Sequence, residues 1–449
     1  MKKPKKTAVS AAQRKPRAPR ARRRRYAIVG TGGRSQMFSK AILDTYPRET
    51  ALVALCDPNP LRMAYHNTQF KEKYGAGPVP TYAPADFDRM LREQRPDAII
   101  VTCMDRLHDH YIVRALEAGC DAITEKPMTT TIPKCRAILD AVERTGRNLR
   151  VTFNYRYSPA RSTIKELLLK KIIGDIKSVH FEWLLDTVHG ADYFRRWHRD
   201  KRNSGGLMVH KATHHFDLVN WWLDSAPETV FGFGQLAFYG AENAEARGVT
   251  QKYFRGTSPE AAGDPFALNL KDGKGLEGLY LKPEKHDHYY RDRNVFSDGI
   301  SIEDTMNVLV RYRNGVQMTY ALTAYSPWEG YRIAFNGTAG RIELDQLEKS
   351  YVSAASGAIG KSFSHSQRIT VFPHWEKPYT VEPPAAIGGH GGGDAPLLAD
   401  LFAPGRTPDP LGRAAGHLDG ARSILTGIAA NESFATGRPV RVDDLLALP

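Results

Sequence analysis

A glycine-rich turn follows a short apolar run at residues 26–29. Gly30 and Gly32 allow a tight turn and a close backbone approach to a pyrophosphate, and a helix beginning at Arg34 would direct free N–H groups at it. Ser35 departs from the third glycine or alanine of the G-x-G-x-x-G/A pattern, but it is small enough for the same packing. The sequence YAIVGTGGRS therefore predicts a phosphate-binding turn, formed by Gly30, Gly32, Gly33, Arg34 and Ser35.

An acidic residue follows the next apolar run. Residues 51–56 read as a buried strand that ends in Asp57, 27 residues after Gly30. A carboxylate at the tip of this strand binds the hydroxyls of an adenosine ribose. It also repels a ribose phosphate, so the sequence predicts NAD as the cofactor. The nearby Arg62 keeps NADP as the alternative.

Glu125 and Lys126 come directly after the apolar residues 121–124. A strand there would place both side chains at the carboxyl edge of a parallel sheet, where open α/β folds bind ligands. A lysine near a positively charged nicotinamide ring would have a lowered pKa, and it could donate a proton to a substrate hydroxyl or help to remove one. The alternative is an ordinary surface lysine at a strand end.

The segment GGLMVHKATHHFDLVNWW spans residues 205–222. Its spacing predicts a helix from Val209, with His210, His214 and Asp217 on one face. His214 could take the hydroxyl proton as hydride leaves, whereas His215 would point away and pack. The H-x-x-x-H spacing also fits a zinc hydrolase, but the segment lacks the glutamate of H-E-x-x-H, and we expect no metal.

The elements that must position these motifs change character along the chain. Strands alternate with helices up to residue 153, which predicts a doubly wound parallel sheet. After residue 178 the strands are long, partly alternating and joined by Gly-containing turns, which predicts antiparallel pairing. The expected fold class is α/β: residues 1–25 form a disordered basic tail, 26–150 a Rossmann domain, and 151–449 a C-terminal α/β domain with a large open sheet. Residues 240–298 are long and polar, and we expect an excursion or lid near the active site.

The charge of the chain is concentrated at one end. Residues 1–25 carry twelve of the basic residues and no acidic one, which leaves +2 of the net +14 for the rest. The body is therefore not expected to bind nucleic acid, although the tail could make nonspecific contacts. The tail has no apolar core of a signal peptide, and no run of 18 apolar residues predicts a membrane span. Four isolated cysteines indicate a reduced, cytoplasmic setting.

Taken in order, the motifs GTGGRS, CDPNP, EKP and GGLMVHKATHHFDL resemble the Gfo/Idh/MocA family, named for glucose-fructose oxidoreductase, inositol dehydrogenase and MocA. The resemblance covers nearly everything after residue 25. It implies NAD(P)-dependent hydride transfer to or from a sugar, cyclitol or related polyol, and an open sheet that forms homodimers or homotetramers. It places the catalytic lysine at Lys126 and the catalytic histidine at His214. The aspartate of the family's D-x-x-x-H pattern is His210 here, followed by Lys211, which suggests a different sugar or an anionic substrate.

The resemblance leaves the outcome of the hydride transfer open. The family also contains NAD-dependent glycosidases, which oxidise a sugar transiently, eliminate the aglycone and return the hydride. Those enzymes need an extra acid or base, and the segment at 186–200, which includes His189 and Asp192, could supply one. A non-catalytic nucleotide-binding protein is a remote alternative. The residues expected to bind the substrate are Tyr155, Tyr193, Arg196, Trp197, His198, His210 and Lys211.

Overall fold

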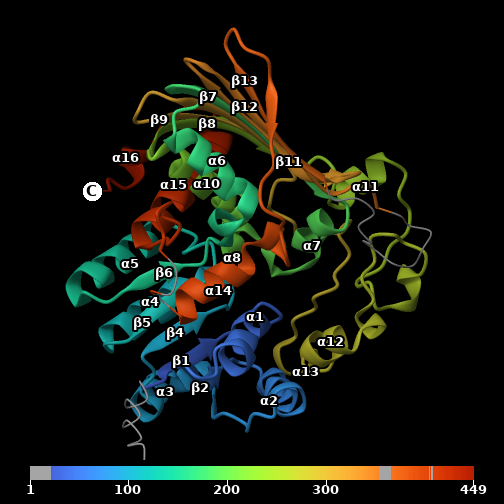
Figure 1. Cartoon of the computed structure of the whole chain (residues 1–449). Helices are drawn as coiled ribbons and strands as arrows, with labels where there is room; N and C mark the ends of the chain where they lie inside the picture. The colour runs from blue at the N-terminus through green and yellow to red at the C-terminus, as the bar shows by residue number, and fades with distance from the viewer. Residues whose placement is uncertain (1–21, 353–365, 404, 406–407, 449) are drawn as a thin grey trace, which may run out of the picture.

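The computed structural model describes residues 22–352, 366–403, 405 and 408–448. Most of the predicted basic tail, residues 1–21, lies outside the described residues. Two sheets dominate the structure, with helices packed between them (Figure 1).

The first sheet is parallel, as predicted, and has the strand order β3-β2-β1-β4-β5-β6. Its strands are β1 (Arg24–Val29), β2 (Thr50–Cys56), β3 (Thr81–Tyr82), β4 (Ala98–Val101), β5 (Asp121–Thr124) and β6 (Leu149–Val151). β1 begins inside the predicted tail, where the Arg24 guanidinium lies 2.6 Å from the carboxylate of Asp121. Ile28, Ile99 and Ile100 are fully buried, as expected for strands covered on both faces.

The helices of this half begin and end at residues that favour those positions. The side chain of Asn59 accepts hydrogen bonds from the first N–H groups of α2, Pro60 is the first helical residue, and Gly75 ends the helix with φ of +63°. Asparagine before proline at the start and glycine at the end are typical limits of a helix. The helices are α1 (Ser35–Lys40), continued by a π-helical turn (Ala41–Thr45), α2 (Pro60–Tyr74), α3 (Phe87–Gln94), α4 (His108–Glu117) and α5 (Ile132–Thr145).

The second sheet has nine strands in the order β14-β13-β12-β11-β7-β10-β9-β8-β15. It is mainly antiparallel, as predicted, although β7 and β10 pair in parallel. Burial alternates along β9 and β10, so one face packs on helices and the other is open. The strands are β7 (Ile176–Asp186), β8 (Pro227–Gln235), β9 (Thr305–Tyr312), β10 (Gln317–Ser326), β11 (Glu329–Gly337), β12 (Gly340–Lys349), β13 (Ser366–Pro373), β14 (Tyr379–Val381) and β15 (Val440–Arg441).

Helices near the C-terminus connect the two sheets. α15 (His417–Thr436) contacts α10 (Thr213–Leu223) and β8 on one side and α5 and β6 on the other. α14 (Asp394–Phe402) packs on the first sheet, where the rings of Phe402 and Tyr26 lie 5.1 Å apart. The predicted domain boundary at residue 150 assigns α14 to the second domain, but α14 packs on the first sheet (Figure 1).

The predicted excursion leaves the second sheet after β8 and returns to it at β9. Its short helices are α11 (Ala241–Ala246), α12 (Lys274–Leu276), a π-helical turn (Glu277–Leu281) and α13 (Glu284–Asp287). Figure 1 shows α12 and α13 beside α2 of the first half. In the part of the chain that the structure describes, no helix combines the length and apolar character that a membrane crossing requires.

The remaining short helices are α6 (Pro159–Leu169) under the second sheet, α16 (Val442–Leu445) near the C-terminus, and α7 (His189–Arg195), α8 (Lys201–Ser204) and α9 (Gly206–His210), which precede α10 along the chain.

Candidate active site

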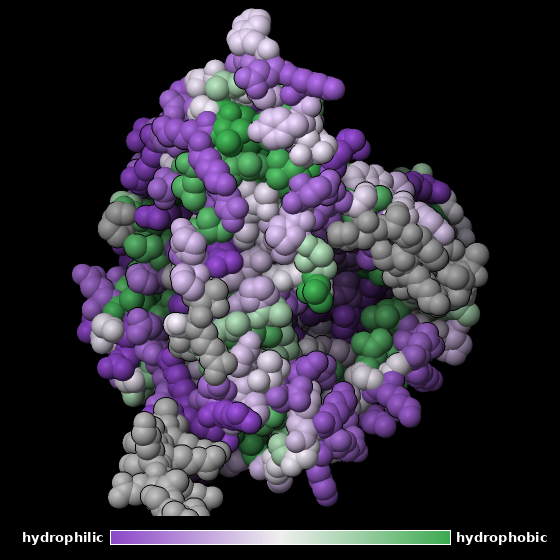
Figure 2. All heavy atoms as spheres, viewed as in Figure 1, coloured by the Kyte–Doolittle hydropathy of each residue, from purple (hydrophilic) through white to green (hydrophobic). Residues whose placement is uncertain are grey.

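A cavity of about 210 Å³ lies at the carboxyl ends of β4 and β5. Most of the predicted catalytic and substrate residues meet there, although the segments that carry them are far apart in the sequence. In Figure 2 this side of the molecule is hollowed between the excursion and the main body. The cavity is lined by Arg34, Thr102, Cys103, Asp105, His108, Glu125, Lys126, Arg196, Trp197, His198, His210, His214 and His390.

The glycine-rich turn has the geometry that the sequence predicts. Gly30 has φ of +85°, and a Cβ there would lie 2.5 Å from the backbone nitrogen of Cys103, so only glycine fits. The N–H of Thr31 donates to the Asp57 carboxylate over 2.7 Å. The turn is therefore held close to the acidic residue predicted to meet the ribose. These residues fit an adenine dinucleotide, because a narrow glycine turn and a carboxylate at the second strand tip are the groups that bind its pyrophosphate and ribose.

The excursion touches this turn directly. The N–H of Gly33 donates to the hydroxyl of Tyr280 over 2.9 Å, across 247 residues of sequence. The amide of Asn59 donates to the carbonyl of Pro283 over 2.8 Å. The predicted lid thus lies over the dinucleotide-binding part of the first sheet.

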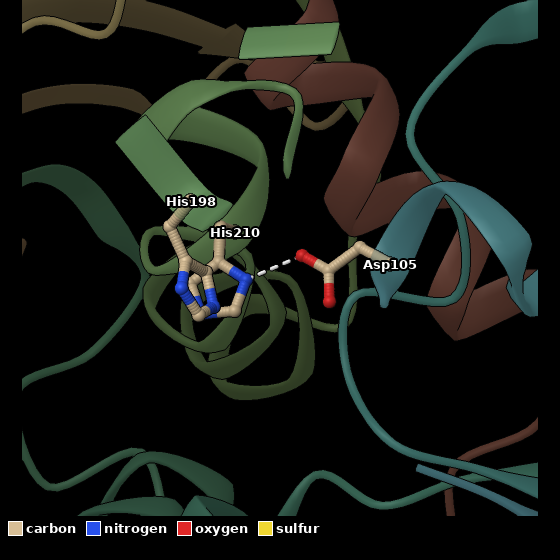
Figure 3. A group of neighbouring side chains, drawn as sticks. All are labelled: Asp105, His198 and His210. Atoms are coloured by element: carbon tan, nitrogen blue, oxygen red, sulfur yellow. Dashed lines mark hydrogen bonds and ion pairs between the residues drawn. The ribbon is translucent and has the colours of Figure 1, made fainter. Parts of the chain in front are cut away.

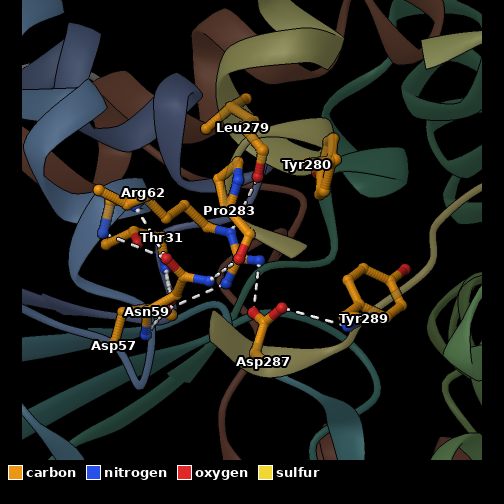
Figure 4. A network of polar contacts seen from close by, with 12 residues as sticks. Thr31, Asp57, Asn59, Arg62, Leu279, Tyr280, Pro283, Asp287 and Tyr289 are labelled. Atoms are coloured by element: carbon orange, nitrogen blue, oxygen red, sulfur yellow. Dashed lines mark hydrogen bonds and ion pairs between the residues drawn. The ribbon is translucent and has the colours of Figure 1, made fainter. Parts of the chain in front are cut away.

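Arg62 links the same two regions, as Figure 4 shows. Its guanidinium lies 3.1 Å from the carboxylate of Asp57 and 2.8 Å from that of Asp287, and its Nε donates to the carbonyl of Leu279 over 3.1 Å. The side chain is almost fully buried. The Arg62 side chain therefore already binds three acceptors and is not available to bind a ribose phosphate.

Lys126 lies at the centre of the cavity wall. Its Nζ donates to the carbonyl of His210 over 3.0 Å and lies 3.4 Å from Nε2 of the same residue. Burial lowers the pKa of Lys126 to about 8, although the nearby Asp105 raises it. An amine with this pKa exchanges protons near neutral pH, which a surface lysine does not.

The histidine segment does not form the one continuous helix that its spacing predicts. His210 and His214 both line the cavity, but Asp217 does not. α9 ends at His210 and α10 begins at Thr213. The N–H groups of both Lys211 and Ala212 bond to the carbonyl of Leu207, which widens the turn and interrupts the helical register. Asp217 forms a buried ion pair with Arg156, the residue that follows the Tyr155 whose ring stacks on His214.

The two cavity histidines of this segment have different surroundings. His214 stacks on the ring of Tyr155 at 4.1 Å, and its Nδ1 has no hydrogen-bond partner among the described residues. Burial and the nearby Lys126 hold the pKa of His214 well below its usual value, so the ring is neutral and can accept a proton. His215 contacts Trp183 and the hydroxyl of Tyr320 and takes no part in the cavity lining, as predicted.

His210 is paired with Asp105, a residue that sequence reasoning missed. The two side chains meet over 2.5 Å through Nδ1 of His210, and Figure 3 shows the carboxylate of Asp105 directed at His210 from the turn that follows β4. Asp105 follows β4 in the sequence TCMD, so its position at the carboxyl edge of the sheet could have been predicted from the sequence. The aspartate of the family pattern is thus replaced by His210, whose carboxylate partner, Asp105, comes from the turn after β4.

Asp105, His198 and His210 have ligand atoms within 4.8 Å of one another and form a cluster that could hold a metal ion. Two features disfavour a cation there. Nδ1 of His210 is occupied by Asp105, and the Lys126 ammonium lies 3.4 Å from the other ring nitrogen. The arrangement is better suited to holding and moving a proton.

The remaining predicted substrate residues divide between the cavity lining and a second layer behind it. Arg196, Trp197 and His198 line the cavity. Behind them, Tyr193 lies with its ring 5.4 Å from that of His210, and Lys211 donates to the Tyr155 hydroxyl over 3.1 Å.

A second histidine–carboxylate pair lies beside Tyr193. His189 contacts Glu329 over 2.6 Å through Nδ1 and the Tyr193 hydroxyl over 3.0 Å through Nε2. Burial opposes the ionisation of Glu329, but His189 and Lys349 lower its pKa to about 2. Glu329 was not predicted, because it begins β11, far from the motif in the sequence.

Arg34 and Glu125, both predicted at the cofactor site, pair with each other over 2.7 Å at the cavity edge. Ser35 is buried, and its hydroxyl donates to the carbonyl of Gly32 over 2.7 Å. A small residue is therefore needed at this position, as the sequence pattern suggests.

Known proteins share this architecture. Residues 24–153 match the model of the oxidoreductase family described as its NAD-binding Rossmann fold, and residues 165–442 match that of its C-terminal alpha/beta domain. An oxidoreductase of Bacillus subtilis, YteT, is 37% identical over 429 residues, which are 92% of this chain and 96% of the relative. D-glucoside 3-dehydrogenase of Escherichia coli is 30% identical over 154 residues, 34% of this chain and 41% of that protein.

A solved structure of similar fold is the WlbA dehydrogenase of Bordetella pertussis in complex with NADH and UDP-GlcNAcA. It has a TM-score of 0.60 at 18% identity and covers 95% of this chain and all of its own. The family resemblance seen in the motifs is confirmed by both domain models and by a relative aligned over nearly its whole length. The chain therefore belongs to the Gfo/Idh/MocA family of oxidoreductases, with an NAD(P)-binding Rossmann domain followed by a C-terminal α/β domain.

Proposed function

We propose that this protein is an NAD-dependent dehydrogenase or reductase that transfers a hydride between nicotinamide and a hydroxyl or keto carbon of a sugar, sugar derivative or cyclitol. One observation carries the proposal: Lys126, with a pKa of about 8, and a neutral His214 line the same cavity at the sheet edge beside the glycine-rich turn. The names of the Escherichia coli relative and of the Bordetella pertussis complex, which act on or bind sugars, support the substrate class.

The bound nicotinamide would accept or donate the hydride. The residues of this chain handle the accompanying proton. His214 offers a neutral ring with an unpartnered Nδ1, and Lys126 offers an amine whose charge changes near the working pH. Asp105 orients His210, which in turn contacts Lys126 and sets its position.

The same site favours NAD over NADP. A ribose phosphate would approach the carboxylate of Asp57, and the guanidinium of Arg62 beside it already binds Asp57, Asp287 and the carbonyl of Leu279.

An NAD-dependent glycosidase is the second candidate, because the protein has a further acid–base pair. His189 with Glu329 lies one tyrosine away from His210, at a place where a second group could remove a proton or protonate a leaving group. A dehydrogenase does not need this pair. The two candidate functions differ in their products, which are NADH for the dehydrogenase and a free aglycone for the glycosidase.

The deciding experiment follows NADH absorbance and aglycone release together on a panel of sugars and aryl glycosides. Stoichiometric NADH supports the dehydrogenase, whereas aglycone release with catalytic NAD and no net NADH supports the glycosidase. Lys126→Ala and His214→Ala should each lose turnover by at least about a hundredfold while still binding cofactor. Lys71→Ala, an exposed lysine on α2, is the matched control; near-normal turnover of either cavity variant would contradict the proposed roles.

We further propose that the chain forms homodimers or homotetramers through the open face of the second sheet, where Phe233 and Leu309 are more than half exposed. A cytoplasmic location is proposed from the four cysteines, which are all unpaired. Sedimentation of the purified protein tests the oligomeric state, and replacing Phe233 by Glu should reduce the mass of the assembly.

A further inference from the structure

Three arginines share one carboxylate next to the cavity. Asp192 contacts Arg291 at 2.7 Å, Arg196 at 3.0 Å and Arg195 at 3.4 Å. Within the described part of the chain, no other carboxylate forms an ion pair with any of the three. The cluster therefore holds two more positive charges than negative ones.

These guanidinium groups also have unused hydrogen-bonding capacity. The Nε atoms of Arg195, Arg196 and Arg291 are buried and have no partner among the described residues. Arg195 is partly satisfied by the carbonyl of Phe266, to which it donates over 2.8 Å. Arg196 and Arg291 have only Asp192 as a charged partner, and a buried donor without an acceptor is costly.

Other groups of the site add to this surplus of positive charge. Of the carboxylates in the lining, Glu125 is paired with Arg34, and the charge of Asp105 is offset by Lys126, because burial keeps His210 beside it neutral. Lys211, only 3% exposed, donates to a phenol and forms no ion pair with a carboxylate of the described residues.

Arg196 is the member of the arginine cluster that reaches the cavity, where it lines the wall together with Lys126 and His210. We propose that the substrate is an acidic sugar, a uronate or a similarly carboxylated sugar, and that its carboxylate binds Arg196 with Arg291 behind it. The inference rests on the proposed function, because it assigns the substrate class of the same cavity. Guanidinium groups suit this role, since their planar fork matches a carboxylate.

A second source of the anion is the cofactor itself. The Arg291 guanidinium lies 5.2 Å from the ring of Tyr280, whose hydroxyl meets Gly33 of the phosphate-binding turn. Arg196, however, lines the cavity together with Lys126. The experiment below separates the two sources.

The test uses NAD⁺-loaded full-length protein and calorimetric titration with matched pairs: glucuronate and glucose, galacturonate and galactose, mannuronate and mannose. At least one uronate should bind about tenfold or more tightly than its parent hexose. Arg196→Gln should reduce that uronate's affinity by about 10- to 100-fold, the range expected for losing a hydrogen bond to a charged group, and Arg196→Lys should recover part of it. Arg202→Gln, which removes an exposed arginine paired with Asp200, is the matched control and should leave the preference intact.

The results that overturn the inference are distinct from those that overturn the hydride chemistry. If no uronate binds more tightly than its hexose, the substrate is not acidic. If Arg196→Gln weakens NAD⁺ binding tenfold and leaves the uronate preference unchanged, the cluster meets the cofactor's phosphate instead. Uronate binding without any formation of NADH would refute the dehydrogenase but not the anion site. Oxidation of neutral hexoses as readily as of uronates would support the dehydrogenase and refute the acidic substrate.

Discussion

Replacing Asp105 by Asn tests whether the carboxylate that pairs with His210 positions Lys126, one of the two residues proposed to handle the proton. The substitution keeps the size of the side chain and removes its charge. Asp105 and His210 are both buried and meet at Nδ1, and His210 in turn contacts Lys126 through its carbonyl and its Nε2. The effect should therefore pass from Asp105 through His210 to Lys126.

Two quantities should change. A hydrogen bond to a charged group contributes about 1.5–3 kcal/mol, which corresponds to a loss of about 10- to 100-fold in kcat/KM. In addition, Asp105 raises the pKa of Lys126, which burial lowers to about 8. Burial raises the pKa of Asp105 itself, whereas Lys126 and Arg196 favour its ionised form. Loss of that ionised form lowers the pKa of Lys126 further. Because oxidation uses the unprotonated amine, the rise of kcat/KM with pH should move below pH 8 in the variant.

The assay is the rate of NADH formation from the best sugar of the panel, measured from about pH 6 to about pH 10, since kcat/KM reports the pKa values of the free enzyme. Asp109→Asn, which changes a carboxylate on α4 outside the cavity lining, is the control. An unchanged pH profile would show that Asp105 is already protonated and has no electrostatic influence on Lys126. A shift to higher pH would refute the reasoning outright.

Three further changes have separable outcomes. Asp57→Ala should weaken NAD binding and narrow its advantage over NADP, measured by tryptophan quenching; equal NADP binding by the unmodified protein would already reject the role of Asp57. Tyr280→Phe should strengthen NAD binding by about two- to tenfold, because the hydroxyl competes with a phosphate oxygen for the N–H of Gly33; weaker binding would mean that Tyr280 helps to hold the cofactor. Asp217→Asn should lower the free energy of unfolding by about 1–3 kcal/mol in urea titrations, since it weakens a buried pair with Arg156 while Asp419 remains 2.9 Å from that arginine; a change in KM instead would place Asp217 in the site after all.

Much of the site could be predicted because its motifs are local. The glycine turn, the cap at Asn59 and the lysine after β5 each depend on a few neighbouring residues, whose conformational preferences act within one turn or strand end. The parallel and antiparallel sheets likewise follow from the spacing of apolar residues and of the turns between them. The residues lining the cavity include Lys126, His210 and His214 as expected.

Other features depended on contacts between distant segments. The spacing from Val209 to Trp222 predicts one helix, yet the helix is interrupted at Lys211 and Ala212, between His210, which pairs with Asp105, and Asp217, which pairs with Arg156. Sequence periodicity carries no information about such partners, because it records only neighbours along one element.

The sequence by itself determined the family, and it predicted the cofactor-binding turn and Lys126 and His214 as proton-handling residues, since these are properties of short motifs. Only the tertiary structure decided that Asp105 supplies the carboxylate missing at position 210, and that the excursion covers the turn through Tyr280. It alone placed Arg291 beside Arg196 on the one carboxylate of Asp192. Each of these contacts joins residues separated by about a hundred positions or more, and such pairs are selected by the packing of whole elements rather than by local preference.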